Sequence, residues 1–129
     1  MLSNVDRIDV LSKCAGIVWV GTSEAYSVAQ FERIRQTNLV GPFRFSRVVL
    51  LGMRSRRDGL LIKIISVSGR DAPLGFGIYA ASKLGLEALT EVLGYEVSGL
   101  GIDPVIAEPE PFPGTHLSAN QEDPGRSQL

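Results

Sequence analysis

The sequence has very few of the residues that build disulfides and metal centres. Cys14 is the only cysteine and His116 is the only histidine among the 129 residues. A single cysteine excludes an internal disulfide, and one thiol with one imidazole is too few for a zinc site of the usual kind. We therefore expect no metal ion.

The chain also lacks an excess of charge of one sign and a long apolar run. Thirteen Lys and Arg against fourteen Asp and Glu give a net charge of −1, which gives no reason to expect a nucleic acid or an anionic membrane as partner. The basic cluster Arg54–Arg57 follows an apolar helical pattern and is predicted to be a solvated last helical turn. Arg44 and Arg47 interrupt the longest apolar candidate, and the N-terminus shows no signal pattern. We expect a cytoplasmic protein.

What the sequence does contain is an alternation of strand and helix patterns. Short apolar runs at 8–14, 59–66 and 102–109 are typical of buried strands, and helical patterns cover about 28–56 and 78–98. Continuous apolar strands separated by helices predict an α/β fold made of consecutive βαβ units with a parallel sheet.

The first helical pattern predicts one buried face and one interruption. Its apolar residues recur at helical spacing and are expected to face the core: Phe31, Ile34, Leu39, Phe43, Val48, Leu51 and Met53. Gly41-Pro42 is expected to bend or break the helix. The polar segment 111–129 is expected to be a loop-like, flexible tail.

Three side chains near the second strand and the second helix can carry chemistry: Ser66, Tyr79 and Lys83. Tyr79 and Lys83 are four residues apart, so they share one face of the predicted helix. A neighbouring ammonium lowers the pKa of a phenol, and such a tyrosine can exchange a proton with an alcohol or carbonyl oxygen. Ser66, at the tip of the strand, can hold the same oxygen. Interconversion of an alcohol and a carbonyl would need a cofactor to carry the hydride.

Other interpretations of these residues remain open at this point. Tyr79 can simply pack in a core while Lys83 is solvated, and Asn38 can be a helix-breaking polar residue beside Gly41-Pro42. A serine hydrolase using Ser66 and His116 is a further alternative, although no Gly-x-Ser-x-Gly motif surrounds the serine.

Five segments in order resemble the short-chain dehydrogenase/reductase family. They are "IDVLSKCAGI", "FERIRQTNLVGPFRFSRVVLLGMR", "GLLIKIISVSG", "YAASKLGLEALTEVL" and "GIDPVIAEPEPFPGT". The fourth carries the family's Tyr-x-x-x-Lys signature, and the resemblance runs from about Val5 to Thr115. It implies that residues 1–129 form a single partial Rossmann-like domain, a doubly wound parallel sheet with about three strands and long helices in this chain.

The resemblance also implies roles for the matched positions. Tyr79 would be the general acid/base, Lys83 would lower its pKa and bind the nicotinamide ribose, Ser66 would orient the substrate oxygen, and Asn38 would anchor a water. The backbone of four further residues would line NAD or NADP: Cys14, Ala15, Gly16 and Pro109. The substrate would be a small alcohol or carbonyl compound.

Several positions depart from the family pattern. The chain contains no Gly-x-x-x-Gly-x-Gly turn of the kind that binds the cofactor pyrophosphate, Lys13-Cys14 stands where two asparagines are usual, and Glu110 replaces a glycine. Lys63 lies in the middle of a predicted strand, where an unpaired buried ammonium is costly. An alternative is therefore a catalytically inactive fragment. Such a chain would pair with another copy or a related chain through the two helices or an open strand edge.

Overall fold

The sheet contains three parallel strands, as the sequence predicts. In the computed structural model, which describes residues 7–66 and 72–109, the strands are β1 (Val10–Lys13), β2 (Gly59–Ile64) and β3 (Ile102–Ala107), in the order β1-β2-β3. Val10 pairs with Leu60, and Gly59 pairs with Ile102. The expected α/β class is confirmed, with each strand a few residues shorter than its apolar run.

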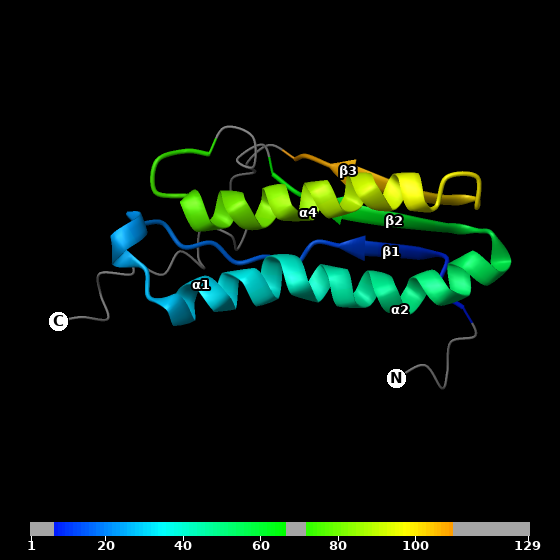
Figure 1. Cartoon of the computed structure of the whole chain (residues 1–129), viewed down its shortest axis with the longest axis horizontal. Helices are drawn as coiled ribbons and strands as arrows, with labels where there is room; N and C mark the ends of the chain where they lie inside the picture. The colour runs from blue at the N-terminus through cyan, green and yellow to red at the C-terminus, as the bar shows by residue number, and fades with distance from the viewer. Residues whose placement is uncertain (1–6, 67–71, 110–129) are drawn as a thin grey trace.

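Helices connect the strands and lie on one face of the sheet. Between β1 and β2 the chain forms a short 3-10 helix η1 (Ser23–Ala25), α1 (Val28–Arg35), a π-helical turn η2 (Gln36–Val40) and α2 (Gly41–Arg56). Helix α4 (Gly77–Glu96) leads from β2 towards β3. Figure 1 shows α2 and α4 side by side in front of the three strands.

Local sequence explains where the helices begin and end. Ser27 caps α1 by accepting from the Gln30 N–H, while the Gln30 side chain accepts from the Ser27 N–H, a complete capping box. Helix α2 ends at Arg57, which takes a left-handed conformation with φ 57°. Arg54 and Arg56 lie in its last turn, as predicted, where basic side chains complement the helix dipole.

The interruption of the long helix lies before Gly41-Pro42 and not at this pair. Gly41 itself has helical backbone angles, and its N–H donates to the Gln36 carbonyl across a π turn. Pro42 has no N–H, so the Asn38 carbonyl cannot receive the hydrogen bond that residue i+4 donates in an α-helix. A π turn of this kind is a local widening that is frequent at functional sites.

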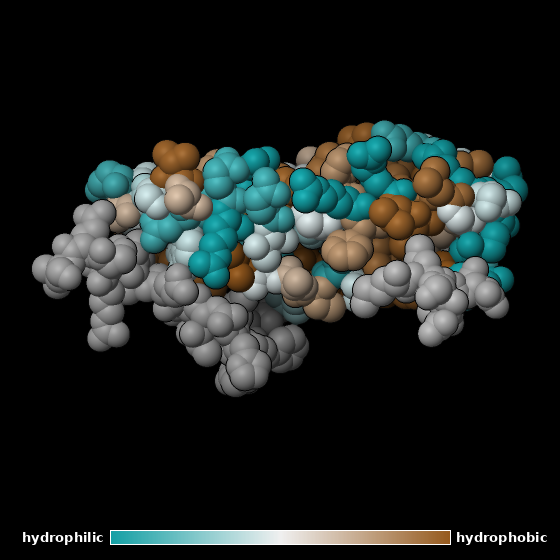
Figure 2. All heavy atoms as spheres, turned by 90° about the horizontal axis from the view of Figure 1, so that it is seen from below, coloured by the Kyte–Doolittle hydropathy of each residue, from teal (hydrophilic) through white to brown (hydrophobic). Residues whose placement is uncertain are grey.

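The prediction of which residues of 28–56 face the core is largely wrong. The residues that α2 buries against the sheet and α4 are Pro42, Ser46, Val49 and Met53. Phe31, Phe43, Val48 and Leu51 are exposed, Leu51 by 76%. Figure 2, seen from the side on which α2 lies, shows hydrophobic side chains gathered over this helix.

The core forms where the helices cover β2. Six buried residues cluster there: Val49, Met53, Leu61, Leu93, Val97 and Ile102. Alternate residues of β2 differ in burial, since Gly59, Leu61 and Lys63 are buried while Leu60, Ile62 and Ile64 are only half-buried. This alternation follows from the helices lying on one face of the sheet.

Lys63 is buried at mid-strand, as the sequence suggested, but it has a hydrogen-bond partner. The side chain is 3% exposed, and Nζ donates to Ser46 Oγ at 2.7 Å, while Ser46 Oγ donates to the Pro42 carbonyl at 2.9 Å. Burial lowers the pKa of Lys63 from 10.5 to about 8, and the positive charge of Lys13 on the paired strand acts in the same direction. Lys63 therefore loses its proton at a lower pH in the folded chain than in the unfolded chain.

Substituting Lys63 by Met tests this burial. Between about pH 8 and pH 10.5 the unfolded chain holds the Lys63 proton and the folded chain does not, so wild-type stability should rise over this range. The difference in pKa corresponds to about 3 kcal/mol. Lys63→Met should be more stable than wild type at neutral pH and should lack the rise, as measured by urea unfolding at a series of pH values.

Arg44→Met is the matched control, because it removes one positive charge from an exposed position of α2. It should keep the wild-type rise. An unchanged pH dependence in Lys63→Met would contradict the assignment.

Candidate active site

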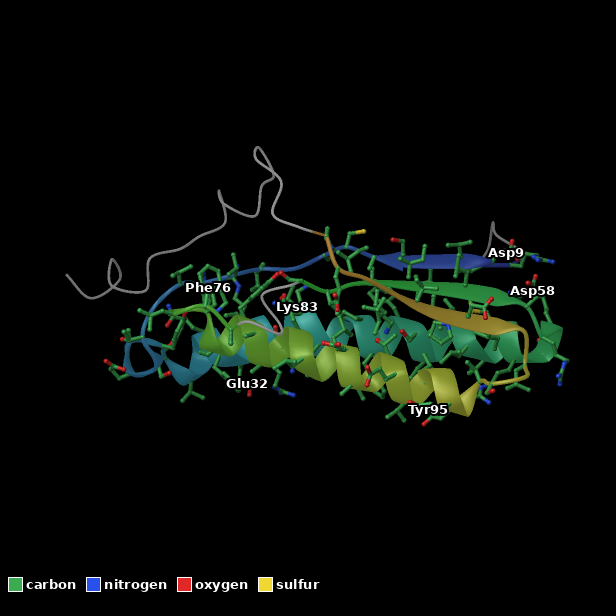
Figure 3. The ribbon with its side chains drawn as sticks, turned by 90° about the horizontal axis from the view of Figure 1, so that it is seen from above. Asp9, Glu32, Asp58, Phe76, Lys83 and Tyr95 are labelled. Carbon is green, nitrogen blue, oxygen red and sulfur yellow. The ribbon has the colours of Figure 1, made fainter. Side chains whose placement is uncertain are left out.

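The predicted site residues gather at the end of the sheet where all three strands finish. Cys14 directly follows β1, Ser66 lies two residues after β2 and Pro109 two residues after β3, and Tyr79 lies in the first turn of α4. In Figure 3, Asp9 and Asp58 mark the opposite end of the sheet from Phe76 and Lys83. Ligands of open parallel sheets bind at the carboxyl ends of the strands, so the fold places these residues where a site is expected.

Tyr79 is buried and is hydrogen-bonded to Ser66. Its side chain is 4% exposed, and the edge of the Phe76 ring meets it with 6.3 Å between centroids and an angle of 75° between planes. Burial raises the pKa of Tyr79 above its ordinary value of 10.0, and the hydrogen bond with Ser66 only partly opposes this. The phenol therefore holds its proton at neutral pH.

Lys83 lies one turn further along α4 and is also buried. Its Nζ donates to the Ile64 carbonyl at 3.0 Å and lies 5.6 Å from the centroid of the Tyr79 ring. Burial lowers the pKa of Lys83, opposed to a smaller extent by Cys14. The expected lowering of the Tyr79 pKa by Lys83 is thus not found in this structure, because burial dominates and the ammonium is directed at a backbone carbonyl.

Asn38 lies in the π turn and is completely buried, with its side-chain amide paired to the backbone of Ile17. Asn38 Oδ1 accepts from the Ile17 N–H at 2.9 Å, and Nδ2 donates to the Ile17 carbonyl at 2.9 Å. We call these two bonds the Asn38–Ile17 pair. Nδ2 also donates to Ser82 Oγ at 3.1 Å. The side chain thus has a structural function, because both Nδ2 protons are donated and Oδ1 already accepts from the Ile17 N–H.

The loop after β1 and the end of β3 carry the remaining predicted residues. A Cβ placed on Gly16 would lie 3.6 Å from both Asn38 Oδ1 and Lys83 Nζ, so this backbone faces the site directly. Cys14, Ala15 and Pro109 are exposed at the ends of β1 and β3. Exposed backbone beside a fixed ammonium is suited to contact with a polar ligand.

Sequence reasoning missed two residues that support the site. Ser82 Oγ donates to the Tyr79 carbonyl at 2.7 Å, a bond that a serine in a helix interior commonly makes to the preceding turn. Tyr26 Oη contacts the carbonyls of Trp19 at 2.6 Å and Gly75 at 3.0 Å. It thereby joins the loop after β1 to the segment that precedes α4. The spacing of Ser82, one helical turn after Tyr79, could have indicated its role from the sequence. No local pattern in the sequence marks Tyr26.

Glu110, His116 and the predicted tail 111–129 lie outside the described residues. Within residues 7–66 and 72–109, no three His, Cys, Asp or Glu side chains come together as metal ligands would. The same part of the chain has no helix with the length and apolarity that crossing a bilayer requires.

Comparison with known proteins identifies what this arrangement is similar to. A family model described as short chain dehydrogenase matches residues 1–124. Human retinol dehydrogenase 8 is 36% identical over 105 residues, which cover 81% of this chain and 34% of that protein. The acetoacetyl-CoA reductase of Allochromatium vinosum is 35% identical over 98 residues, which cover 76% of this chain and 40% of that protein.

Solved structures agree with the sequence relatives. A short-chain dehydrogenase from Streptomyces avermitilis has a TM-score of 0.84 at 33% identity, with 95% of this chain and 45% of that chain covered. A gluconate 5-dehydrogenase from Burkholderia cenocepacia, in complex with NADP and tartrate, has a TM-score of 0.86 at 28% identity, with 91% and 46% covered. The chain therefore spans less than half the length of these relatives, and its neighbours share the expected Rossmann-type fold.

Removing the Asn38 side chain should destabilise the folded chain. Asn38→Ala deletes three hydrogen bonds and removes the partners of the half-buried Ile17 N–H and carbonyl, which should lower the free energy of unfolding by about 2–4 kcal/mol. Gln36→Ala, at an exposed position of the same π turn, is the control and should change it far less. If urea unfolding showed the same loss of free energy of unfolding for Asn38→Ala and Gln36→Ala, the Asn38–Ile17 pair would not be important for stability.

Proposed function

Since the chain belongs to the short chain dehydrogenase family, we propose that it interconverts an alcohol and a carbonyl with NAD or NADP, and that Tyr79 is the general acid/base. The observation that supports this most strongly is the hydrogen bond between Ser66 and Tyr79 at the carboxyl end of β2, with Lys83 fixed one turn away. Two hydroxyl groups held together in this way can both contact one substrate oxygen.

The proton inventory of the site favours reduction of a carbonyl. The buried Tyr79 phenol is protonated at neutral pH and can donate this proton to a carbonyl oxygen, while Ser66 hydrogen-bonds to the same oxygen. When bound, a nicotinamide cofactor supplies the hydride that the carbonyl carbon accepts. In the reverse direction Tyr79 has to take up the alcohol proton as a phenolate, and burial of the phenol opposes this.

The residues around Lys83 fit a nicotinamide cofactor. Lys83 uses one of its three N–H donors on Ile64, so two donors remain for hydroxyl groups of a ribose. Gly16 has no side chain between its backbone and Lys83, and Cys14, Ala15 and Pro109 leave exposed backbone nearby. We propose that these residues hold the nicotinamide half of the cofactor.

We propose that the Asn38 carbonyl anchors a water molecule from which Tyr79 is reprotonated. Both Nδ2 protons of Asn38 are used by Ile17 and Ser82, so the side chain has no donor left for substrate. The carbonyl lacks its α-helical donor because residue 42 is proline, and a carbonyl freed in this way can accept from water.

Cofactor binding and turnover test the proposed function together. Saturating NADH or NADPH should raise the unfolding temperature, since a ligand at about 100 times its Kd stabilises by about 2.7 kcal/mol. Oxidation of NADH or NADPH should be seen with at least one of three carbonyl probes chosen from the names of similar proteins: retinal, acetoacetyl-CoA and 3-ketodihydrosphingosine. Tyr79→Phe should keep the thermal shift and lose about 100-fold or more of the turnover.

Tyr95→Phe is the matched control, because Tyr95 lies on the same helix and is 81% exposed. It should retain both properties. Full turnover in Tyr79→Phe would contradict the mechanism. A wild-type chain that binds neither cofactor would contradict the function and favour a non-catalytic binding module.

The binding-module alternative is supported by the outward faces of α2 and α4. Phe45, Val48 and Leu51 on α2 are exposed by 59%, 57% and 76%, and Val92 on α4 is exposed by 51%. Apolar side chains at this density on neighbouring helices are unusual for a surface that stays in water. We propose that the chain associates through these helices with a second copy or a related chain, whether or not it is active.

A single charge should disrupt this association. Leu51→Glu should shift the sedimentation coefficient towards that of the monomer, because a buried carboxylate in an apolar contact is strongly unfavourable. Arg54→Glu, an exposed change one turn further along α2, is the control and should sediment like the wild type. A wild-type chain that is monomeric at all concentrations and does not co-purify with a full-length relative would contradict the proposal.

A further inference from the structure

The Ser82 hydroxyl joins two parts of the site through hydrogen bonds whose direction is fixed. Asn38 Nδ2 carries only protons and the Tyr79 carbonyl can only accept. Ser82 Oγ must therefore accept from Asn38, at 3.1 Å, and donate to Tyr79, at 2.7 Å. All three side chains are buried, with Ser82 5% exposed.

These bonds leave Asn38 one orientation. Exchanging its oxygen and nitrogen would place two donors against each other at the Ile17 N–H and two acceptors against each other at the Ile17 carbonyl. It would also turn Oδ1 towards Ser82, whose only proton is already donated to Tyr79. The orientation of Asn38 is therefore determined together with the position of the first turn of α4.

We propose that Ser82 is a positioning residue, which fixes the backbone of Tyr79 relative to Asn38 and to the loop that carries Gly16. Ser82 Oγ bonds directly to the π turn and to the start of α4, and the loop after β1 is joined to it through Asn38, which bonds to both Ser82 and Ile17. Its consequence for catalysis rests on the proposed function of Tyr79, whereas its effect on the structure does not.

A second buried hydroxyl on α4 provides a matched comparison. Thr90 Oγ1 donates to the Leu86 carbonyl at 2.6 Å, the same type of bond to the preceding turn. In the part of the chain that the structure describes, no side-chain donor is recorded to Thr90, whereas Ser82 receives the Asn38 amide. A purely local role would make Ser82 equivalent to Thr90.

The experiment compares Ser82→Ala with Thr90→Val by amide hydrogen exchange and by NMR titration of tyrosine. The probe amide is Ile17, which donates to Asn38, and the reference is Leu60, which donates to the Asp9 carbonyl at 2.9 Å within the sheet. Ser82→Ala should speed exchange at Ile17 about tenfold relative to Leu60. It should also move the titration of Tyr79, assigned with Tyr79→Phe, towards its ordinary pKa because a loosened turn admits water.

Thr90→Val should change Ile17 and Leu60 exchange by the same factor and leave the Tyr79 titration unchanged. Ser82→Thr keeps the hydroxyl and should restore protection of Ile17. The proposal would be overturned if Ser82→Ala and Thr90→Val had the same effect on Ile17 exchange and on the Tyr79 titration. It would also be overturned if Ile17 exchanged as fast in Ser82→Thr as in Ser82→Ala. Neither readout needs cofactor or substrate, so a chain without turnover leaves this test intact and contradicts only the proposed function.

Discussion

The structure depends on the pairing of one buried side-chain amide with one backbone unit. The Asn38–Ile17 pair fills both hydrogen-bonding groups of a half-buried loop residue that follows β1. Backbone groups that are withdrawn from water and lack partners are strongly disfavoured, so this pair stabilises the path of the loop beside the buried Asn38. The π turn is the local distortion that brings Asn38 to Ile17, and Gly41 and Pro42 follow it. The site residues at the end of the sheet are arranged around this contact.

Burial is the second physical effect that shapes this structure, and it shifts three titratable groups towards their neutral forms. It raises the pKa of Tyr79 and lowers the pKa values of Lys63 and Lys83, so each group is shifted towards its neutral form. Hydrogen bonds to Ser66, Ser46 and the Ile64 carbonyl supply partners without supplying a negative charge. At Tyr79, burial therefore favours the protonated phenol over the phenolate.

Sequence patterns predicted what depends on short-range periodicity and failed where tertiary contacts decide. The three strands and α4 follow from apolar runs and helical spacing, and the Tyr79–Lys83 pair follows from its spacing of four residues. The buried stripe of the first helical region runs through Ile34, Asn38, Pro42, Ser46, Val49 and Met53. Its central members are the polar residues Asn38 and Ser46 and the proline Pro42, so a search for large apolar residues at helical spacing selected the opposite face. The partners of Asn38 lie 21 and 44 residues away, and no local pattern contains them.

The contacts that hold the candidate site come from two consecutive βαβ units. Ser66, Tyr79 and Lys83 belong to the unit that contains β2 and α4, while Gly16, Ile17 and Asn38 belong to the unit that contains β1 and α2. Ser82, Lys83 and Tyr26 connect the two units by hydrogen bonds or close approach. Strand β2 is shared by both units and lies at the centre of the sheet, so its carboxyl end is supported from either side. The relative placement of Tyr79, Lys83 and Asn38 is therefore held by contacts between these two units.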